Sequence, residues 1–129
     1  MIEQINKISR KDKIYPNGHV YKISELETGI FYIGSSINLK TRMWKHKHDF
    51  YNIDRDAYYL PFYVELRRLN KSIKDCTKLA LEEYENITLK QLREYENQYI
   101  KQFENDNLNY NKNRTHITKK EKEEYCKQY

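Results

Sequence analysis

One glutamate lies on the apolar side of a predicted helix. Stepping by three and four through residues 89–103 gives the series Leu89, Leu92, Glu96, Tyr99 and Phe103. At about 100° per residue these positions share one helix face, so Glu96 lies among the residues expected to pack. A carboxylate on such a face must be paired, protonated or bound to a metal. Glu96 is therefore a candidate metal ligand; a structural ion pair with an arginine, or an irregular helix end, is the alternative.

An arginine and a histidine lie four residues apart in a second predicted helix, at residues 39–48. Arg42 and His46 project from the same helix face at this spacing. A guanidinium presents a planar fork of donors that suits a phosphate, and an imidazole can exchange a proton near neutral pH or contact a leaving group. The alternative is a solvated basic face, because the same helix also carries Lys40, Lys45, Lys47 and His48.

Two tyrosines come from consecutive predicted strands. Tyr21 and Tyr32 can lie side by side on one face of a sheet. The chain contains 13 tyrosines, so a core aromatic pair with solvated hydroxyls is the alternative interpretation.

Short β-rich runs and helical periods predict the elements that position these side chains. Runs at 20–23 and 30–34, joined by a polar connector that contains Gly29, predict a hairpin. The remaining expected elements, in chain order, are a helix at 39–48, a helix at 58–70, a strand at 78–84 and a helix at 89–103. Asn38 and Thr88 are the expected N-caps of the first and last of these helices.

The two ends of the chain differ from this central part. Residues 1–17 are predicted to be a polar lead-in that ends in a turn at Pro16, Asn17 and Gly18. Residues 114–129 are predicted to be a charged tail helix that opens with a capping box. The domain between them, 18–113, has the order β-β-α-α-β-α, which predicts an α/β fold with a small sheet covered by helices.

Composition excludes several classes of protein. The chain has no run of about 18 apolar residues, which excludes a transmembrane helix, and its polar start lacks the apolar segment of a secretory signal. Cys76 and Cys126 are far apart and form no disulfide framework, so an intracellular protein is expected. Lys and Arg (24) exceed Asp and Glu (19), giving a net charge of +5. That excess alone is a weak indication of a polyanionic partner.

Taken in order, the candidate residues resemble a known nuclease family. The ordered set is Val20-Tyr21, Tyr32-Ile33-Gly34, Arg42-x-x-x-His46, Glu96-Asn97-Gln98-Tyr99-Ile100 and Tyr110-Asn111. This set resembles the GIY-YIG nuclease domain over residues 18–113. The resemblance implies a three-stranded antiparallel sheet flanked by helices. It also implies cleavage of phosphodiester bonds in DNA with one divalent metal ion, Mg²⁺ or Mn²⁺.

The resemblance assigns roles to individual residues. Its implied catalytic set is Tyr21, Tyr32, Arg42, His46, Glu96 and Asn111, with Gly34 as the glycine that closes the second motif. Glu96 would hold the metal ion and Arg42 would bind the phosphate. Either tyrosine could orient and deprotonate the attacking water, assisted by His46, with Arg42 and the metal favouring the phenolate form. The sequence does not rank the two tyrosines.

Two positions depart from the family pattern. His19 stands where the first glycine is expected, and Ser35 stands where some members carry a lysine. A catalytically inactive DNA-binding module of the same fold is therefore the second hypothesis.

Basic residues on the helix at 39–48 are predicted to contact DNA. Lys40, Lys45, Lys47 and His48 would bind backbone phosphates, which provides affinity without sequence selectivity. No membrane partner is expected, and the sequence does not indicate an oligomeric state.

Overall fold

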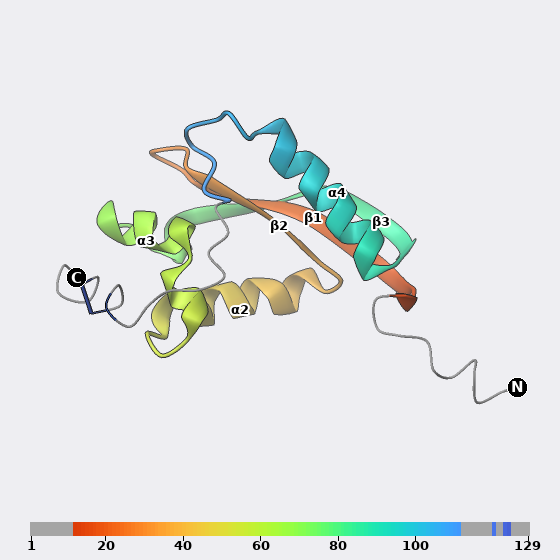
Figure 1. The fold of residues 1–129 in the computed structure, drawn as a ribbon, viewed down its shortest axis with the longest axis horizontal. Helices are drawn as coiled ribbons and strands as arrows, with labels where there is room; N and C mark the ends of the chain where they lie inside the picture. The colour runs from red at the N-terminus through yellow and green to blue at the C-terminus, as the bar shows by residue number, and fades with distance from the viewer. Residues whose placement is uncertain (1–11, 112–119, 121–122, 125–129) are drawn as a thin grey trace, which may run out of the picture.

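A three-stranded antiparallel sheet in the order β2-β1-β3 forms the centre of the molecule (Figure 1). The strands are β1 (Tyr15–Glu25), β2 (Phe31–Ser36) and β3 (Cys76–Ile87). The computed structural model describes residues 12–111, 120 and 123–124. The expected small antiparallel sheet flanked by helices is confirmed.

The first two strands form the expected hairpin, and their register places Tyr21 opposite Gly34 and Ile23 opposite Tyr32. The turn expected at residues 16–18 is wrong, because β1 begins at Tyr15 and these residues lie in the strand. β2 reaches back only to the position opposite His19, so the start of β1 pairs with β3 alone. Proline is tolerated at such a one-sided position because its missing N–H leaves no ladder bond broken on the open side.

The third strand is longer than its alternating pattern indicates. The pairing steps from Val20 opposite Glu82 to Tyr21 opposite Ala80, so Leu81 is an extra residue on β3. Such a bulge bends and twists the strand.

Helices cover both faces of the sheet (Figure 1). The α-helices are α2 (Leu39–Tyr51), α3 (Pro61–Arg68) and α4 (Leu89–Gln102), and short 3-10 turns are η2 (Asp56–Tyr59) and η3 (Ile73–Asp75). The expected N-caps are confirmed: Asn38 accepts from the Thr41 N–H, and Thr88 forms a capping box with Gln91.

The helix expected at 58–70 is shorter than predicted. Pro61 starts α3 well because its fixed φ suits a first turn, but its ring prevents a continuous helix through it. The preceding residues therefore form the separate turn η2.

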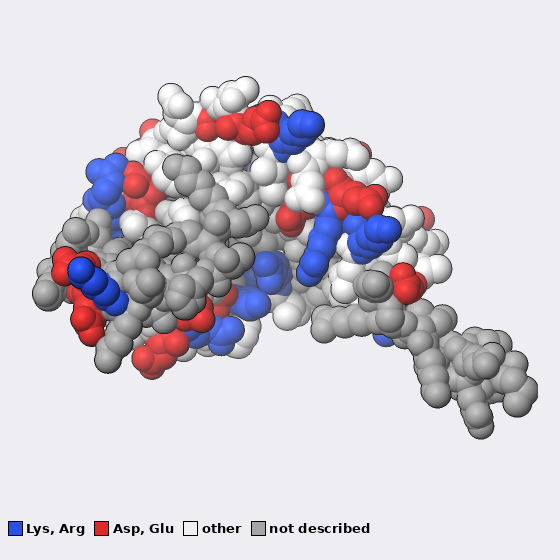
Figure 2. Space-filling view, viewed as in Figure 1, with Lys and Arg blue, Asp and Glu red and all other residues white. Residues whose placement is uncertain are grey.

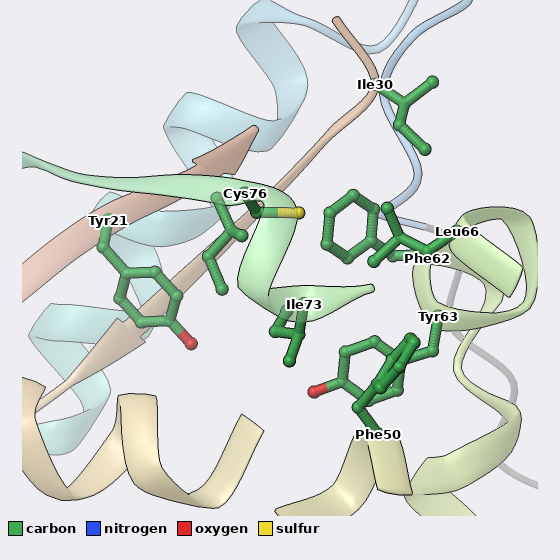
Figure 3. Close-up of a cluster of buried hydrophobic side chains, with 9 residues drawn as sticks. Tyr21, Ile30, Phe50, Phe62, Tyr63, Leu66, Ile73 and Cys76 are labelled. Atoms are coloured by element: carbon green, nitrogen blue, oxygen red, sulfur yellow. The ribbon is translucent and has the colours of Figure 1, made fainter. Parts of the chain in front are cut away.

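Two hydrophobic clusters hold these layers together. Val20, Ile33 and Leu92 belong to the cluster between the sheet and α4. Tyr21, Phe62 and Tyr63 belong to the cluster between the sheet and the α2 and α3 helices. Figure 3 shows that the hydroxyl groups of Tyr21 and Tyr63 point toward one another in this second cluster.

The chain after α4 returns to the free edge of β2. The Phe31 N–H donates to the Leu108 carbonyl at 2.8 Å, and the Tyr110 N–H donates to the Phe31 carbonyl at 2.9 Å. This parallel contact covers the first half of an otherwise open strand edge.

The expected tail helix falls mainly outside the described residues. Of residues 114–129 the structure describes Lys120, Glu123 and Glu124, all helical. Within the described part of the chain, no helix is both long and apolar enough to span a lipid bilayer.

Candidate active site

A pocket of about 330 Å³ opens at the outer edge of β2, between α2 and α4. Its lining includes Tyr32 and Ser35 from β2, Arg42 from α2, and Arg93 and Glu96 from α4. Three predicted site residues, Tyr32, Arg42 and Glu96, therefore share one pocket although they come from three different elements. Because β2 is an edge strand, the pocket is reached from outside without crossing the sheet.

Glu96 is half-buried and accepts a hydrogen bond from the Ser35 hydroxyl at 2.7 Å. Within residues 12–111 no basic side chain forms an ion pair with it, so the ion-pair alternative has no counterpart there. Its helix is regular from Leu89 to Gln102, which also removes the irregular-end alternative. The pattern on α4 thus correctly placed a carboxylate on the inward side of the helix.

The side-chain oxygens of Glu96 and Ser35 are the type of ligand that a hard divalent cation prefers. Over the described residues there is no group of three or more His, Cys, Asp or Glu side chains that could hold a metal ion. Mg²⁺ needs no such cage, because it retains several waters and is commonly held by one or two carboxylates together with substrate phosphate. Glu96, with the pocket volume beside it, fits that mode of binding.

Arg42 connects the pocket to the interior. Its Nε donates to the Tyr21 hydroxyl at 3.3 Å, while the residue also lines the pocket. This hydrogen bond restrains a long side chain, so less conformational entropy is lost when the guanidinium binds an anion.

Behind Arg42 lies a buried chain of hydrogen bonds formed by Tyr21, His46 and Tyr63. The Tyr21 hydroxyl lies 2.6 Å from His46 Nε2, and His46 Nδ1 hydrogen-bonds the Tyr63 hydroxyl. Neither Tyr21 nor His46 lines the pocket, so the structure does not bring these two predicted catalytic residues to its surface. Burial is the main cause, since Tyr21 is fully covered by the hydrophobic cluster around it.

His46 is neutral at pH 7. Burial, with the positive charge of Arg42 as the second cause, lowers its pKa from 6.5 to about 3. A neutral imidazole has one donor and one acceptor. Because Arg42 already donates to the Tyr21 oxygen, we infer that the Tyr21 hydroxyl donates to Nε2 and that Nδ1 donates to Tyr63.

The structure distinguishes Tyr32 from Tyr21, the two tyrosines that the sequence could not rank as the residue that orients water. Tyr32 lines the pocket, whereas Tyr21 lies behind it. Burial and the nearby Glu96 raise the pKa of Tyr32, and the opposing charge and hydrogen bond of Arg42 offset this only in part. Burial likewise raises the pKa of Tyr21. Arg42 does favour the phenolate, as expected, but desolvation outweighs its effect, so the net pKa of each tyrosine is raised.

Gly34 allows Tyr21 to lie where it does. A Cβ atom at position 34 would lie 2.5 Å from Tyr21 Cζ, so the phenol ring packs directly over the glycine. The cross-strand pairing of these two residues explains why this motif glycine matters to the site.

Asn111 binds the backbone of β2 instead of lining the pocket. Its Oδ1 accepts from the Ile33 N–H at 2.8 Å, and its Nδ2 donates to the Ile33 carbonyl at 2.5 Å. The side chain thereby extends the parallel contact made by Tyr110, and it holds the strand that carries Tyr32 and Ser35.

Tyr63 is the residue that sequence reasoning missed. The sequence indicated only that it lies within the helix expected at 58–70, and its hydroxyl partner, His46, lies 17 positions away on another element. No local pattern identifies such a partner.

The four basic residues predicted to bind DNA are all exposed, but they do not share one side of α2. Lys45 is three positions after Arg42 and lies on the pocket side of the helix. Lys40 and Lys47 lie on the opposite side. On the face shown in Figure 2, acidic and basic side chains are intermixed over α4 and the sheet. On this visible face, charge therefore marks no DNA-binding surface.

A larger hollow of about 420 Å³ lies between α2, α3 and η3 and contains none of the predicted site residues. Its arginine, Arg67, donates to the carbonyls of Tyr58 and Phe50 and thus ties loop backbone together.

Comparison of the chain with protein-family models, with curated proteins and with solved structures finds no match. What remains is the geometry of the molecule itself: a pocket at a strand edge that a guanidinium, a carboxylate and a phenol line together.

Proposed function

We propose that this protein is a metal-dependent endonuclease that hydrolyses DNA phosphodiester bonds, of the GIY-YIG type that its ordered residues resemble. The observation that carries the proposal is the pocket shared by Tyr32, Arg42 and Glu96. Phosphodiester hydrolysis concentrates negative charge on phosphoryl oxygens, so its catalysts mainly position the reactants and neutralise charge. A DNA substrate would place the enzyme inside the cell.

Each pocket residue has a distinct role in this proposal. Arg42 binds the scissile phosphate and stabilises its growing charge. Glu96, oriented by Ser35, would hold Mg²⁺ or Mn²⁺, which when bound would neutralise phosphoryl oxygens and activate water.

Tyr32 orients the attacking water as a neutral phenol. Its raised pKa keeps the hydroxyl protonated at pH 7, so it positions water by hydrogen bonding. Tyr21 and His46 support the site from behind, because they hold Arg42 and do not line the pocket.

The test compares two glutamates of the same helix. Wild-type protein is expected to nick or cut supercoiled plasmid with Mg²⁺ or Mn²⁺ and not with a chelator. Glu96→Gln should lower the rate by about 10²-fold or more, whereas Glu94→Gln, an exposed neighbour outside the pocket, should leave it unchanged. Equal cleavage by the two variants, or no cleavage by wild type in any metal, would refute the proposal.

The second candidate is a DNA-binding module without turnover. The observation that favours it is the placement of Tyr21 and His46 outside the pocket. Retention of DNA that weakens with salt, without cleavage in any divalent metal, would select this alternative.

A further inference from the structure

The side of α2 that faces away from Arg42 carries a second group of residues with nucleic-acid chemistry. The α2 outer face, as we call it, consists of Lys40, Trp44, Lys47, His48 and Tyr51, at the spacing i, i+4, i+7, i+8 and i+11. All five are exposed. None belongs to the proposed active-site pocket.

Two large aromatic side chains on this face have little cover. Trp44 is 61% exposed and Tyr51 is 53% exposed. The Trp44 ring lies against the His48 ring, with 3.8 Å between the ring centres, which fixes the orientation of the indole. Exposed and oriented rings at helical spacing are costly to keep in water, and they commonly mark a binding surface.

The same face is cationic. The only acidic residue of α2, Asp49, is buried on the opposite side and pairs with Arg55 at 2.6 Å. A further cation comes from η3, where the Lys74 ammonium lies 5.8 Å from the centre of the Tyr51 ring. A polyanion with flat apolar groups is the complementary partner.

A hollow of about 250 Å³ lies at the C-terminal end of this face. Lys47, His48, Tyr51 and Asn52 line it. These residues offer a cation for a phosphate, rings for stacking, and the Asn52 Nδ2, which can donate to the edge of a base while its Oδ1 accepts from the Asp54 N–H.

We propose that the α2 outer face binds single-stranded nucleic acid, with unpaired bases stacked on Trp44 and Tyr51 and backbone phosphates at Lys40 and Lys47. Bases in a duplex are stacked on each other, so only unpaired bases can cover these rings. An acidic peptide would satisfy the lysines but would leave both rings exposed. This inference goes beyond the proposed cleavage activity and does not require it.

The chain itself provides the probe, because Trp44 is its single tryptophan. The 129-residue chain at low salt with a chelator is titrated with a short oligothymidine, an oligouridine of the same length, and a duplex of that length. The single strands should quench tryptophan emission strongly and the duplex weakly. Comparison of the oligothymidine with the oligouridine shows whether single-stranded DNA or single-stranded RNA binds more tightly.

Variants test the assignment to Trp44. Trp44→Ala should weaken oligothymidine binding, followed by anisotropy of a labelled strand, by about tenfold and leave duplex binding unchanged. Lys47→Gln should weaken it less. The matched control is Leu79→Ala on β3, which removes an apolar side chain of similar exposure (60%) and should change nothing.

Three results would overturn the inference: equal quenching by duplex, equal quenching by polyglutamate, or equal losses in Trp44→Ala and Leu79→Ala. Failure of the cleavage proposal would show in the plasmid assay, which is independent of the quenching assay. Glu96→Gln should quench like wild type even though it cuts plasmid about 10²-fold more slowly or worse.

Discussion

His46 lies between the phenols of Tyr21 and Tyr63 and beside the guanidinium of Arg42, and these neighbours and its burial determine its protonation state. Its ring nitrogens are both hydrogen-bonded, to Tyr21 and to Tyr63, and the side chain is almost fully buried. A proton added to it would be poorly solvated and close to Arg42. His46 therefore acts as a fixed hydrogen-bond acceptor for Tyr21, and it does not titrate in the physiological range.

The first prediction at this scale concerns stability against pH. The folded pKa of His46 (about 3) lies below the usual 6.5, so protonation favours the unfolded chain. The contribution of neutral His46 is complete above pH 6.5 and is lost as the pH falls toward 3. Urea unfolding of wild type should show this loss, up to about 1.4 kcal/mol per pH unit.

The control for this prediction is His46→Gln, which cannot gain a proton. Its free energy of unfolding should start lower and fall less between pH 7 and pH 5. Parallel losses in the two proteins would contradict the assignment.

A second prediction concerns Tyr63. Tyr63→Phe keeps the ring that packs on Phe50 and Phe62 but removes the partner of His46 Nδ1. We expect the kcat of plasmid cleavage to fall by about tenfold with little change in KM, because the support of Arg42 through Tyr21 and His46 is weakened. A loss confined to kcat, with KM unchanged, is a result that a purely structural role would not cause.

Tyr95→Phe serves as the control for Tyr63→Phe. Tyr95 is a partly exposed tyrosine that stacks on Tyr84, far along the chain from the hydrogen-bonded residues. An equal loss of kcat in both variants would remove Tyr63 from the site.

At the scale of elements, β2 carries the site and is fixed from two sides. Within the sheet, the Tyr21 ring lies over Gly34. At the free edge, Asn111 pairs with both backbone groups of Ile33. The half of β2 that ends in Ser35 and Ser36 is left uncovered by this contact, and the pocket opens at that half.

The prediction at this scale is that Gly34→Ala destabilises the fold. The added Cβ overlaps the Tyr21 phenol, and overpacking of a closed site costs about 1–3 kcal/mol. The denaturant midpoint of unfolding should fall accordingly. In a Tyr21→Ala background the same change should cost much less. An unchanged midpoint for the single variant would show that the ring moves aside freely.

At the scale of the molecule, local sequence pattern predicted single elements. It correctly indicated the hairpin, both N-caps and the inward side of α4 that carries Glu96. It could not predict partners between elements. Asn111 and Ile33 are 78 residues apart, and Tyr21 and His46 are 25 apart.

Some expectations failed for the same reason. The Pro-Asn-Gly series at residues 16–18 favours a turn locally, but pairing with the long strand β3 extends β1 through it. The pKa of a tyrosine depends on how much water the fold removes from it, which no spacing reveals.

The prediction for the whole molecule concerns salt. Because acidic and basic side chains are intermixed over the visible face, duplex binding should depend on a few lysines near the pocket (Figure 2). Lys45→Gln should reduce the slope of log affinity against log salt by about one phosphate contact. Lys101→Gln, an exposed lysine at the end of α4, should leave the slope unchanged. Identical slopes for both variants would place duplex DNA elsewhere.

The burial of His46 has a practical consequence for the chemical modification of histidines. An acylating reagent needs a free imidazole nitrogen, and both nitrogens of His46 are engaged inside the protein. Of the two histidines of α2, His48 is the exposed one and would be acylated first. Acylation of His48 would alter the outward side of α2, whereas the histidine behind Arg42 would survive the treatment intact.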